Sequence, residues 1–154
     1  MDMTKPLAHA SAFAYDGIGC LLTGDTASGK SRLLAEAVYH GAKMIADDQV
    51  QLAVEGEQLI ARPVPHLRGI LELRGFGLVR MADTLDAHPI HLTVRLDSAS
   101  HVRLPEPCSQ KHCGLNIPYL LLPPPPKLAI ISLLLYLKAM QEGRILPTDW
   151  HPKG

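Results

Sequence analysis

The sequence predicts an α/β domain of the P-loop type, with a mixed or antiparallel sheet, a helix directly after the P-loop and an apolar helix near the C-terminus. Two local patterns support this fold class. Residues 24–31 fit the phosphate-loop pattern Gly-x4-Gly-Lys-Ser/Thr between an apolar run and a helical pattern, and alternating extended runs recur elsewhere. With 154 residues, the chain is long enough for one domain with a real core and too short for two. We therefore expect residues 1–154 to form a single domain.

The P-loop carries most of the functional interpretation. An apolar run at residues 18–22 predicts the strand that enters it, and residues 33–40 predict a helix that ends at Gly41. In that setting, backbone N–H groups and the positive end of the helix dipole converge on a phosphate. The flanking strand and helix disfavour the alternative, a glycine-rich turn with an exposed lysine. The predicted nucleotide-binding residues are Gly24, Asp25, Thr26, Ala27, Ser28, Gly29, Lys30 and Ser31. Lys30 supplies a charge for the outer phosphates, and the hydroxyl of Ser31 can bind Mg²⁺.

A β-hairpin is predicted before the P-loop. Residues 9–15 and 18–23 are extended runs on either side of Asp16-Gly17, and Asp-Gly in that position is a strong signal for a tight turn. This pairing places His9 on the strand beside the one that enters the P-loop. A single histidine there is more often a solvated or hydrogen-bonded strand residue than a functional one, so spacing alone leaves its role open.

The second functional signal is a short apolar strand, residues 44–46, that ends in Asp47 and Asp48. In P-loop enzymes an acidic residue at the end of a neighbouring strand holds Mg²⁺ or its water, and a second carboxylate can accept the proton of an attacking hydroxyl. Two adjacent acids could divide these roles in either order. The alternative is an Asp-Asp turn that leads into a strand at residues 49–54, since turns favour aspartate. The P-loop one helix upstream favours the functional interpretation.

The middle of the chain is predicted to be mainly scaffold. Residues 51–54 and 58–61 form a hairpin around residues 55–57. In residues 71–79, Glu72 and Arg74 flank an apolar residue and two glycines follow, which predicts a strand, a bulge and a surface ion pair. Residues 90–97 alternate without a fault and predict a strand with one buried and one solvent-facing side.

The C-terminal part is predicted to be a loop followed by a helix. Residues 98–126 hold seven of the 13 prolines and have no clear periodicity, so we expect a long loop. Within it, Cys108, His112 and Cys113 lack a second pair of ligands at usable spacing, so no zinc site is predicted. Residues 123–126 are four prolines that supply the start of a helix at 127–142, which Gly143 ends. That helix is apolar on nearly every face and is either sandwiched inside the domain or, as we favour, shared with another subunit.

Composition excludes several classes of function. Lys plus Arg and Asp plus Glu are both 15, so the overall charge gives no reason to expect a nucleic-acid partner. Three cysteines without a framework suit a reducing compartment, and we expect the cytoplasm. The N-terminus resembles no export signal, and the most apolar stretch, residues 128–137, is too short to span a bilayer, so no membrane partner is expected.

Together these motifs resemble the catalytic domain of the bacterial HPr kinase/phosphorylase family. The resemblance covers residues 7–142. It rests on His9, the P-loop, the sequence Ala46-Asp47-Asp48 and the signature Glu-x-Arg-Gly-x-Gly at residues 72–77. Generic P-loop kinases lack the last two of these motifs in combination.

The resemblance implies a domain related to the nucleotide-binding part of phosphoenolpyruvate carboxykinase. It implies an ATP- and Mg²⁺-dependent kinase that phosphorylates a serine of the phosphocarrier HPr, or of a nitrogen-type paralogue, in phosphotransferase-system regulation. In this assignment Lys30 binds the phosphates, and Ser31 and Glu72, with Asp47, bind Mg²⁺. Asp48, beside Asp47, is the base and His9 lines the phosphate site. The family also catalyses phosphorolysis with inorganic phosphate and assembles into hexamers.

Several departures from the family pattern bear on the reverse reaction. The usual N-terminal domain is missing, so the resemblance implies a short form. Arg32 and Arg80 stand where the family has acids, and residues 119–127 replace a motif of the type Val-Pro-Val-x-x-Gly-Arg-Asn that is tied to phosphorolysis. Residues 120–126 offer few donors, and Lys127 is the only cation nearby in sequence. Because donors are missing from residues 120–126, we expect little or no phosphorolysis. The resemblance also implies that Arg103 corresponds to the catalytic arginine of dephosphorylation, which is the residue that could supply a cation instead.

Two other functions remain open from the sequence. One is a regulatory module that binds ATP and a partner without transferring phosphate, and the other is a small-molecule P-loop kinase. Retention of Lys30, Ser31, both aspartates and Glu72 favours the protein kinase, because a protein that only binds ATP needs no base.

Overall fold

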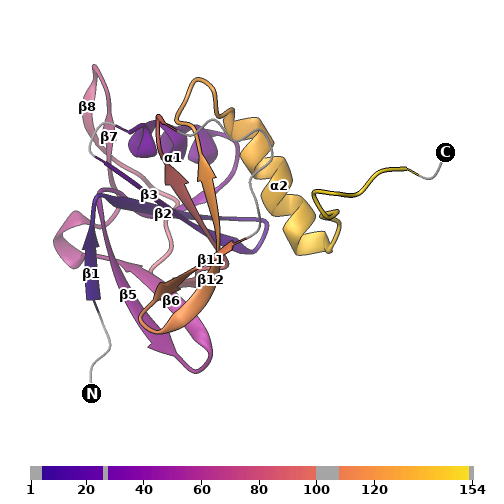
Figure 1. The fold of residues 1–154 in the computed structure, drawn as a ribbon. Coiled ribbons are helices and arrows are strands. Elements are labelled where there is room, and N and C mark those ends of the chain that lie inside the picture. Colours follow the sequence, from indigo (N-terminus) through magenta and orange to yellow (C-terminus); the bar gives the residue numbers. More distant parts are fainter. Residues whose placement is uncertain (1–4, 26–27, 100–107, 153–154) are drawn as a thin grey trace.

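The computed structural model describes residues 5–25, 28–99 and 108–152 of the chain. In these ranges it has two α-helices, one short 3₁₀ helix and twelve strands (Figure 1). Their bounds are β1 Lys5–Ala8, β2 Ala10–Tyr15, β3 Ile18–Gly24, α1 Lys30–Tyr39, β4 Lys43–Ala46, β5 Gln49–Glu55, β6 Gln58–Pro63, η1 Pro65–Leu67, β7 Ile70–Leu73, β8 Gly77–Arg80, β9 His88–Pro89, β10 Leu92–Leu96, β11 Cys108–His112, β12 Leu115–Leu122 and α2 Ile130–Glu142. Neither described helix is long and apolar enough to cross a membrane.

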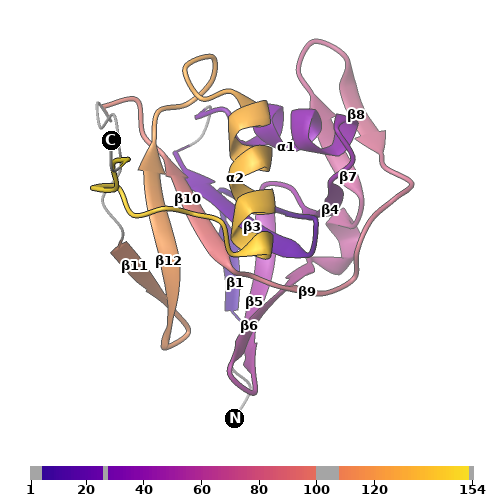
Figure 2. The ribbon, with the colours of Figure 1, turned by 90° about the vertical axis from the view of Figure 1, so that its right-hand side faces the viewer.

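The fold is α/β with a mixed sheet, as predicted. The central sheet has the strand order β11-β12-β10-β3-β2-β4, in which β3 pairs parallel with β10 and antiparallel with β2. A second sheet has the order β1-β5-β6-β9, and β7 and β8 form a separate hairpin. Figure 2 shows α2 in front of the central sheet, with α1 at its upper end.

Alternation along β3 explains why the sheet is covered on both faces. Cys20 and Leu22 belong to a buried cluster that includes side chains of α1 and α2, whereas Leu21 between them belongs to a cluster shared with β5 and β6. Successive strand residues point to opposite faces, so a continuous apolar run is what a strand between two layers requires. The chain therefore forms helices, central sheet and second sheet as three successive layers.

The predicted N-terminal hairpin is confirmed. β2 and β3 pair antiparallel from Ala10 with Thr23 to Tyr15 with Ile18. Asp16 and Gly17 between them have φ values of 52° and 82°, the positive values that a two-residue type I′ turn requires. The hairpin of β5 and β6 is confirmed as well.

The helix after the P-loop starts earlier than predicted. α1 begins at Lys30 rather than at residue 33, because the first helical turn is part of the P-loop motif itself. Its predicted end is correct within a residue, and Gly41 beyond it has a φ of 103°.

Three predictions in the second half of the chain were wrong. β10 has no solvent-facing side: Leu92, Thr93 and Val94 are buried and Arg95 is half-buried, because β10 lies between β3 and β12 and both its faces are covered. The predicted loop at residues 98–126 contains β11 and β12, whose pairing is set by tertiary contacts and not by local alternation. Residues 70–80 form a hairpin, not a bulged strand, and no ion pair joins Glu72 to Arg74 in the described chain.

The C-terminal helix is confirmed, with a later start. α2 begins at Ile130, and Gly143 ends it in the left-handed conformation. Leu133 and Leu137 are among its buried residues, whereas Ile131 and Leu135 are 50% and 63% exposed. Among the described residues the helix is therefore not covered on every side, and its face with Ile131 and Leu135 is exposed.

Candidate active site

The strand register brings the predicted site residues to one edge of the central sheet. Thr23, at the end of β3, lies opposite Ala10 at the start of β2, and Gly24 lies opposite Leu96 at the end of β10. Since β4 runs antiparallel to β2, its C-terminal end reaches the same edge. The P-loop, His9 and the two aspartates after β4 are therefore neighbours in space.

Two glycines let the loop pass close to neighbouring segments. Gly24 has a φ of 144°, and a Cβ on it would lie 2.8 Å from the carbonyl oxygen of Leu96. Gly29 has a φ of 99°, and a Cβ there would lie 2.9 Å from Cδ of Pro125. No side chain caps the N-terminus of α1 and its first turn has no acidic residue. The amide groups at this helix end and its dipole are thus arranged to favour an anion.

Lys30 is held within the loop that precedes it. Its Nζ donates to the carbonyl oxygens of Gly24 and Asp25, both at 2.8 Å, and to Oγ of Ser28 at 3.2 Å. The residue is only 7% exposed. Burial lowers the pKa of Lys30. The nearby carboxylates of Asp48, Asp25 and Asp47 act in the opposite direction and partly offset this shift. The ammonium group therefore brings a positive charge to the centre of the loop.

Asp47 is the most tightly connected acid of the site. One carboxylate oxygen accepts from Oγ of Ser11 at 2.7 Å, and both oxygens lie within hydrogen-bond distance of Oγ of Ser31, at 2.9 and 3.1 Å. Asp47 is 8% exposed and Ser11 is fully buried. Ser11 also accepts from the backbone N–H of Asp48 at 3.4 Å, so one hydroxyl positions both aspartates.

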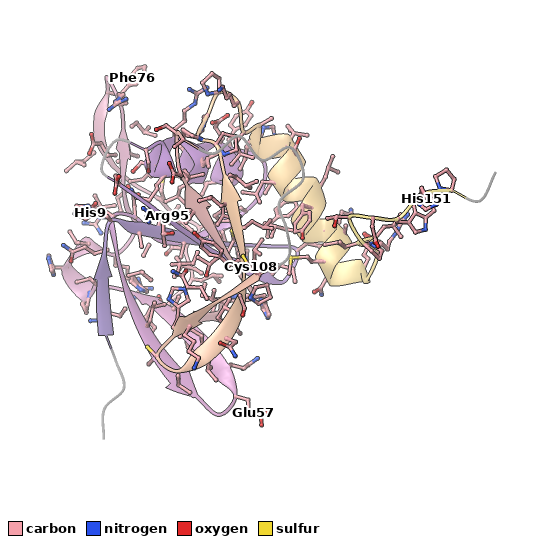
Figure 3. The ribbon with its side chains drawn as sticks, viewed as in Figure 1. His9, Glu57, Phe76, Arg95, Cys108 and His151 are labelled. Atoms are coloured by element: carbon pink, nitrogen blue, oxygen red, sulfur yellow. The ribbon has the colours of Figure 1, made fainter. Side chains whose placement is uncertain are left out.

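Asp48 faces the solvent beside His9. Nδ1 of His9 lies 4.0 Å from Oδ1 of Asp48, and their side chains are 59% and 69% exposed. Both residues have positive φ values, 59° for His9 and 66° for Asp48. Such conformations are uncommon for residues other than glycine and are concentrated at functional sites. A hydrogen bond from the N–H of Ala10 to the carbonyl of Asp48, at 3.2 Å, holds the two turns together. His9 therefore lies in the turn before β2 and not on the strand as predicted (Figure 3).

Glu72 lies in a different setting, on the hairpin of β7 and β8. Leu71 anchors β7 in the core beside α1, while Glu72, the next residue, is exposed. It pairs across the hairpin with Leu78, and Phe76 at the hairpin tip is 91% exposed (Figure 3). Among the described residues no hydrogen bond or ion pair holds the Glu72 carboxylate, so none of them fixes its orientation.

Serine and carboxylate oxygens are suitable ligands for Mg²⁺. Ser31 and Asp47 already lie in contact and present hard oxygen donors of the kind that Mg²⁺ prefers. In the described ranges no cluster of three or more His, Cys, Asp or Glu side chains could hold a metal ion by itself. The donor set therefore fits a Mg²⁺ ion that takes its remaining ligands from phosphate groups and water.

One family model covers most of this architecture: the HPr Serine kinase C-terminal domain matches residues 3–122. The chain belongs to this family. The matched range contains the P-loop, both aspartates, His9 and the hairpin of β7 and β8.

Two curated relatives have the name HPr kinase/phosphorylase. The protein from Levilactobacillus brevis is 33% identical over 89 residues, which are 57% of this chain and 29% of the relative. The protein from Pediococcus pentosaceus is 29% identical over 96 residues, 62% of this chain and 31% of the relative. The chain therefore spans less than a third of each of these proteins.

The fold also matches a solved structure, the HPr(Ser) kinase/phosphatase from Coxiella burnetii. The match has a TM-score of 0.81 and covers 90% of this chain and 92% of that one, at 22% sequence identity. This likeness concerns the fold: an α/β domain with a mixed sheet and two helices in the described ranges.

Sequence reasoning did not identify two residues of this HPr kinase-type domain. Ser11 sits in an apolar strand and gave no signal beyond being a polar residue between alanines. Arg95 belongs to the strand that the sequence predicts as scaffold with one solvent-facing side, but its Nη2 lies 4.0 Å from Oδ1 of Asp25 in the P-loop. Arg95 is thus a cation beside the P-loop that the sequence pattern did not single out. Arg103, Thr26 and Ala27 lie outside the described residues.

Proposed function

We propose that this chain is an ATP- and Mg²⁺-dependent kinase that phosphorylates a serine of HPr or of a nitrogen-type paralogue. The observation that carries the proposal is the convergence of Lys30, the Ser31–Asp47 pair and the Asp48–His9 pair on one edge of the sheet. A protein that only binds nucleotide needs the first two of these features. The exposed carboxylate of Asp48 beside them is what a transfer reaction requires in addition.

Each side chain has a definite task in this proposal. The ammonium of Lys30 exchanges its loop acceptors for phosphate oxygens and stabilises their charge. Asp48, open to solvent, accepts the proton of the attacking serine hydroxyl, and His9 lies close enough to orient it. Ser31 and Asp47, with Glu72, would hold Mg²⁺, which when bound neutralises charge on the phosphates. Ser11 keeps Asp47 in place for that task.

The finer features of the family are part of the same proposal. They are a P-loop domain of the phosphoenolpyruvate-carboxykinase-like type, formed by residues 1–154 as one domain, and assembly into homo-oligomers such as hexamers. The uncovered face of α2, with Ile131 and Leu135, supports a subunit contact because such a face costs free energy in water. None of the three cysteines, Cys20, Cys108 and Cys113, is part of a disulfide, which supports a cytoplasmic location.

Weak or absent phosphorolysis is a further part of the proposal. The proline segment lies beside the P-loop, since a Cβ on Gly29 would meet Cδ of Pro125 at 2.9 Å, and prolines offer no N–H to an incoming phosphate. Pyrophosphate release from serine-phosphorylated HPr in excess phosphate should therefore be far slower than the forward reaction.

The decisive experiment is transfer of labelled phosphate from ATP to the phosphocarrier of the same organism, with Mg²⁺ present. Label on the phosphocarrier, absent with Lys30→Ala, supports the proposal. Nucleotide binding without transfer indicates the regulatory module. Nucleotide-dependent turnover of a metabolite with an unlabelled phosphocarrier indicates the small-molecule kinase.

Asp48→Asn tests the assignment of the base. An amide cannot take the serine proton, so nucleotide binding should persist while transfer falls by about 10²–10⁴-fold. Asparagine also tolerates the positive φ of this position. The matched control is Asp86→Asn, because Asp86 is 68% exposed and Asp48 is 69% exposed. If Asp48→Asn weakens only the response to Mg²⁺, the two aspartates have the opposite division of roles.

A further inference from the structure

Arg95 comes from the strand on the other side of β3 from the aspartates. In the central sheet β10 flanks β3 on one side and β2 and β4 flank it on the other. Arg95 lies opposite Thr23 in the parallel pairing of β10 with β3, one residue before the first glycine of the P-loop. Because parallel strands end at the same edge, Arg95 reaches the P-loop from the side that has no acidic pair.

Arg95 and Lys30 meet at the same loop residue. Lys30 donates to the backbone carbonyl of Asp25 at 2.8 Å, and the guanidinium of Arg95 lies 4.0 Å from the side-chain carboxylate of Asp25. Both cations are therefore within reach of one small group placed at the mouth of the loop. Figure 3 labels Arg95 and, beside it in this view, His9.

The ion pair between Arg95 and Asp25 is one that a ligand can displace. The Asp25 side chain is 95% exposed and that of Arg95 is 40% exposed, so the pair is weak and solvent-screened. No described residue forms a hydrogen bond with the guanidinium at this distance, so its N–H donors can bind an oxyanion in bidentate fashion. The Asp25 carboxylate thus lies where a ligand anion could bind Arg95, and it holds Arg95 only weakly.

The electrostatics of the loop favour an added anion between the two cations. Burial is the main cause of the lowered pKa of Lys30, and Arg95 adds a smaller contribution in the same direction because the two positive charges repel each other. A phosphate that contacts both cations would add two attractions that offset this repulsion. The transferring group of ATP has the negative charge and the three equatorial oxygens that such a pair can share.

We propose that Arg95 leaves Asp25 when ATP binds and contacts the outermost phosphate group, opposite Lys30, so that it orients the group to be transferred. This inference rests on the proposed function and adds to it a cation from β10 that distinguishes the triphosphate from the diphosphate. No bond is made or broken in this exchange: one ion pair is replaced by another.

The test compares Arg95→Gln with the wild-type protein in binding of ATP and of ADP, each with Mg²⁺, and in transfer to the phosphocarrier. We expect Kd for ATP to rise about tenfold while Kd for ADP changes less than about twofold, and kcat to fall by at least about tenfold. Arg95→Lys should restore part of the ATP preference because it keeps the charge. Arg62→Gln is the matched control, since Arg62 is 38% exposed, pairs with Glu55 and lies on the hairpin of β5 and β6.

A second variant tests the exchange itself. Asp25→Asn removes the present partner of Arg95, so it should tighten ATP binding by about two- to threefold in the wild type and have no such effect in Arg95→Gln. Additive effects of the two substitutions would contradict the exchange.

The outcomes separate this inference from the proposed function. Equal loss of ATP and ADP affinity in Arg95→Gln, with a lower Tm, would mean that Arg95 only supports the loop and would overturn the inference. Unchanged binding and transfer would overturn it as well. A wild-type protein that binds neither nucleotide would instead overturn the proposed function.

Discussion

The two regions proposed to bind Mg²⁺ are built in opposite ways. Around Asp47, the buried carboxylate accepts hydrogen bonds from two serines on two different elements, β2 and α1. On the hairpin of β7 and β8, Glu72 is exposed, whereas its neighbours Leu71 and Leu73 are buried in or packed against the core. The first region is organised by the fold before any ligand arrives. The second region places a carboxylate near α1 without fixing its direction.

This difference separates stability from function. A buried carboxylate with two donors contributes to the folded state, because hydrogen bonds to a charged acceptor are stronger than those to a neutral one. An exposed carboxylate without a partner contributes almost nothing to stability, so its loss should affect only what it binds. Substitutions in the two regions should therefore differ in their effect on unfolding even where both reduce transfer.

Among substitutions in these two regions, the largest effect is expected for Asp47→Asn. Transfer should fall by about 10³-fold, and the free energy of unfolding should fall by about 1–3 kcal/mol because Ser11 and Ser31 lose a charged acceptor. Phosphate transfer and urea denaturation measure the two effects. Asp83→Asn, at a side chain that is 75% exposed, is the control. Wild-type stability in Asp47→Asn would show that the hydrogen-bonded centre is not stabilising.

Glu72→Gln should reduce transfer without reducing stability. The carboxylate has no hydrogen-bond or ion-pair partner among the described residues, so its neutralisation should leave Tm unchanged. Transfer at limiting Mg²⁺ should fall by about 10–100-fold and recover partly as Mg²⁺ is raised. Glu57→Gln, in the exposed turn after β5, is the control. A clear drop in Tm would remove the contrast between the two regions.

Ser11→Ala should have a smaller effect of both kinds. Asp47 keeps Ser31 as a donor but loses the shorter hydrogen bond from Ser11, so we expect about 1 kcal/mol of lost stability and about a tenfold weaker response to Mg²⁺. Ser109→Ala on the exposed strand β11 is the control. Unfolding in urea and Mg²⁺ titration of transfer provide the measurements. An unchanged Mg²⁺ response would reduce Ser11 to a packing role.

The smallest effect lies outside both regions. Nδ1 of His91 accepts a hydrogen bond from the N–H of Gly19 at 2.9 Å, so the ring must be neutral at that nitrogen. Burial, with a smaller effect of His88, lowers the pKa of His91, and burial lowers that of His112. The unfolded chain therefore binds more protons than the folded one as the pH falls. The contribution of these histidines to stability is fully present above their ordinary pKa of 6.5, and it is lost as the pH falls toward their lowered pKa in the folded state.

The measurement is the urea midpoint at pH 7.5 and at lower pH. The loss should be equally large in wild type, Asp47→Asn and Glu72→Gln, and smaller in His91→Gln. A pH dependence that disappears in Asp47→Asn would assign it to the buried centre instead.

Local signals were sufficient for the elements whose chemistry is local. Asp16-Gly17 predicted the first hairpin, Gly143 predicted the end of α2, and the P-loop pattern predicted the strand-loop-helix unit that the structure contains. Turn residues and glycines act within a few positions of themselves, so their meaning can be read from a short stretch of sequence.

The errors arose where neighbours in space decide the environment. β10 alternates like a surface strand, but its position between β3 and β12 buries both faces. β11 and β12 lie in a proline-rich stretch, and β12 is held by parallel pairing with β10 at long range. Alternation reports one face of a strand and cannot report what covers the other.

For the site, the sequence by itself determined which groups are available: a P-loop with Lys30 and Ser31, two acids at a strand end, and Glu72 in a family signature. Only the tertiary structure decided how they are used, because strand register sets the distances between them. It placed Ser11 against Asp47 and left Glu72 exposed to solvent. It also made Asp48 and His9 neighbours, since each lies in a turn where its φ is positive. It also brought Arg95 to the P-loop from a strand about 70 residues away in sequence, a contact that no local pattern encodes.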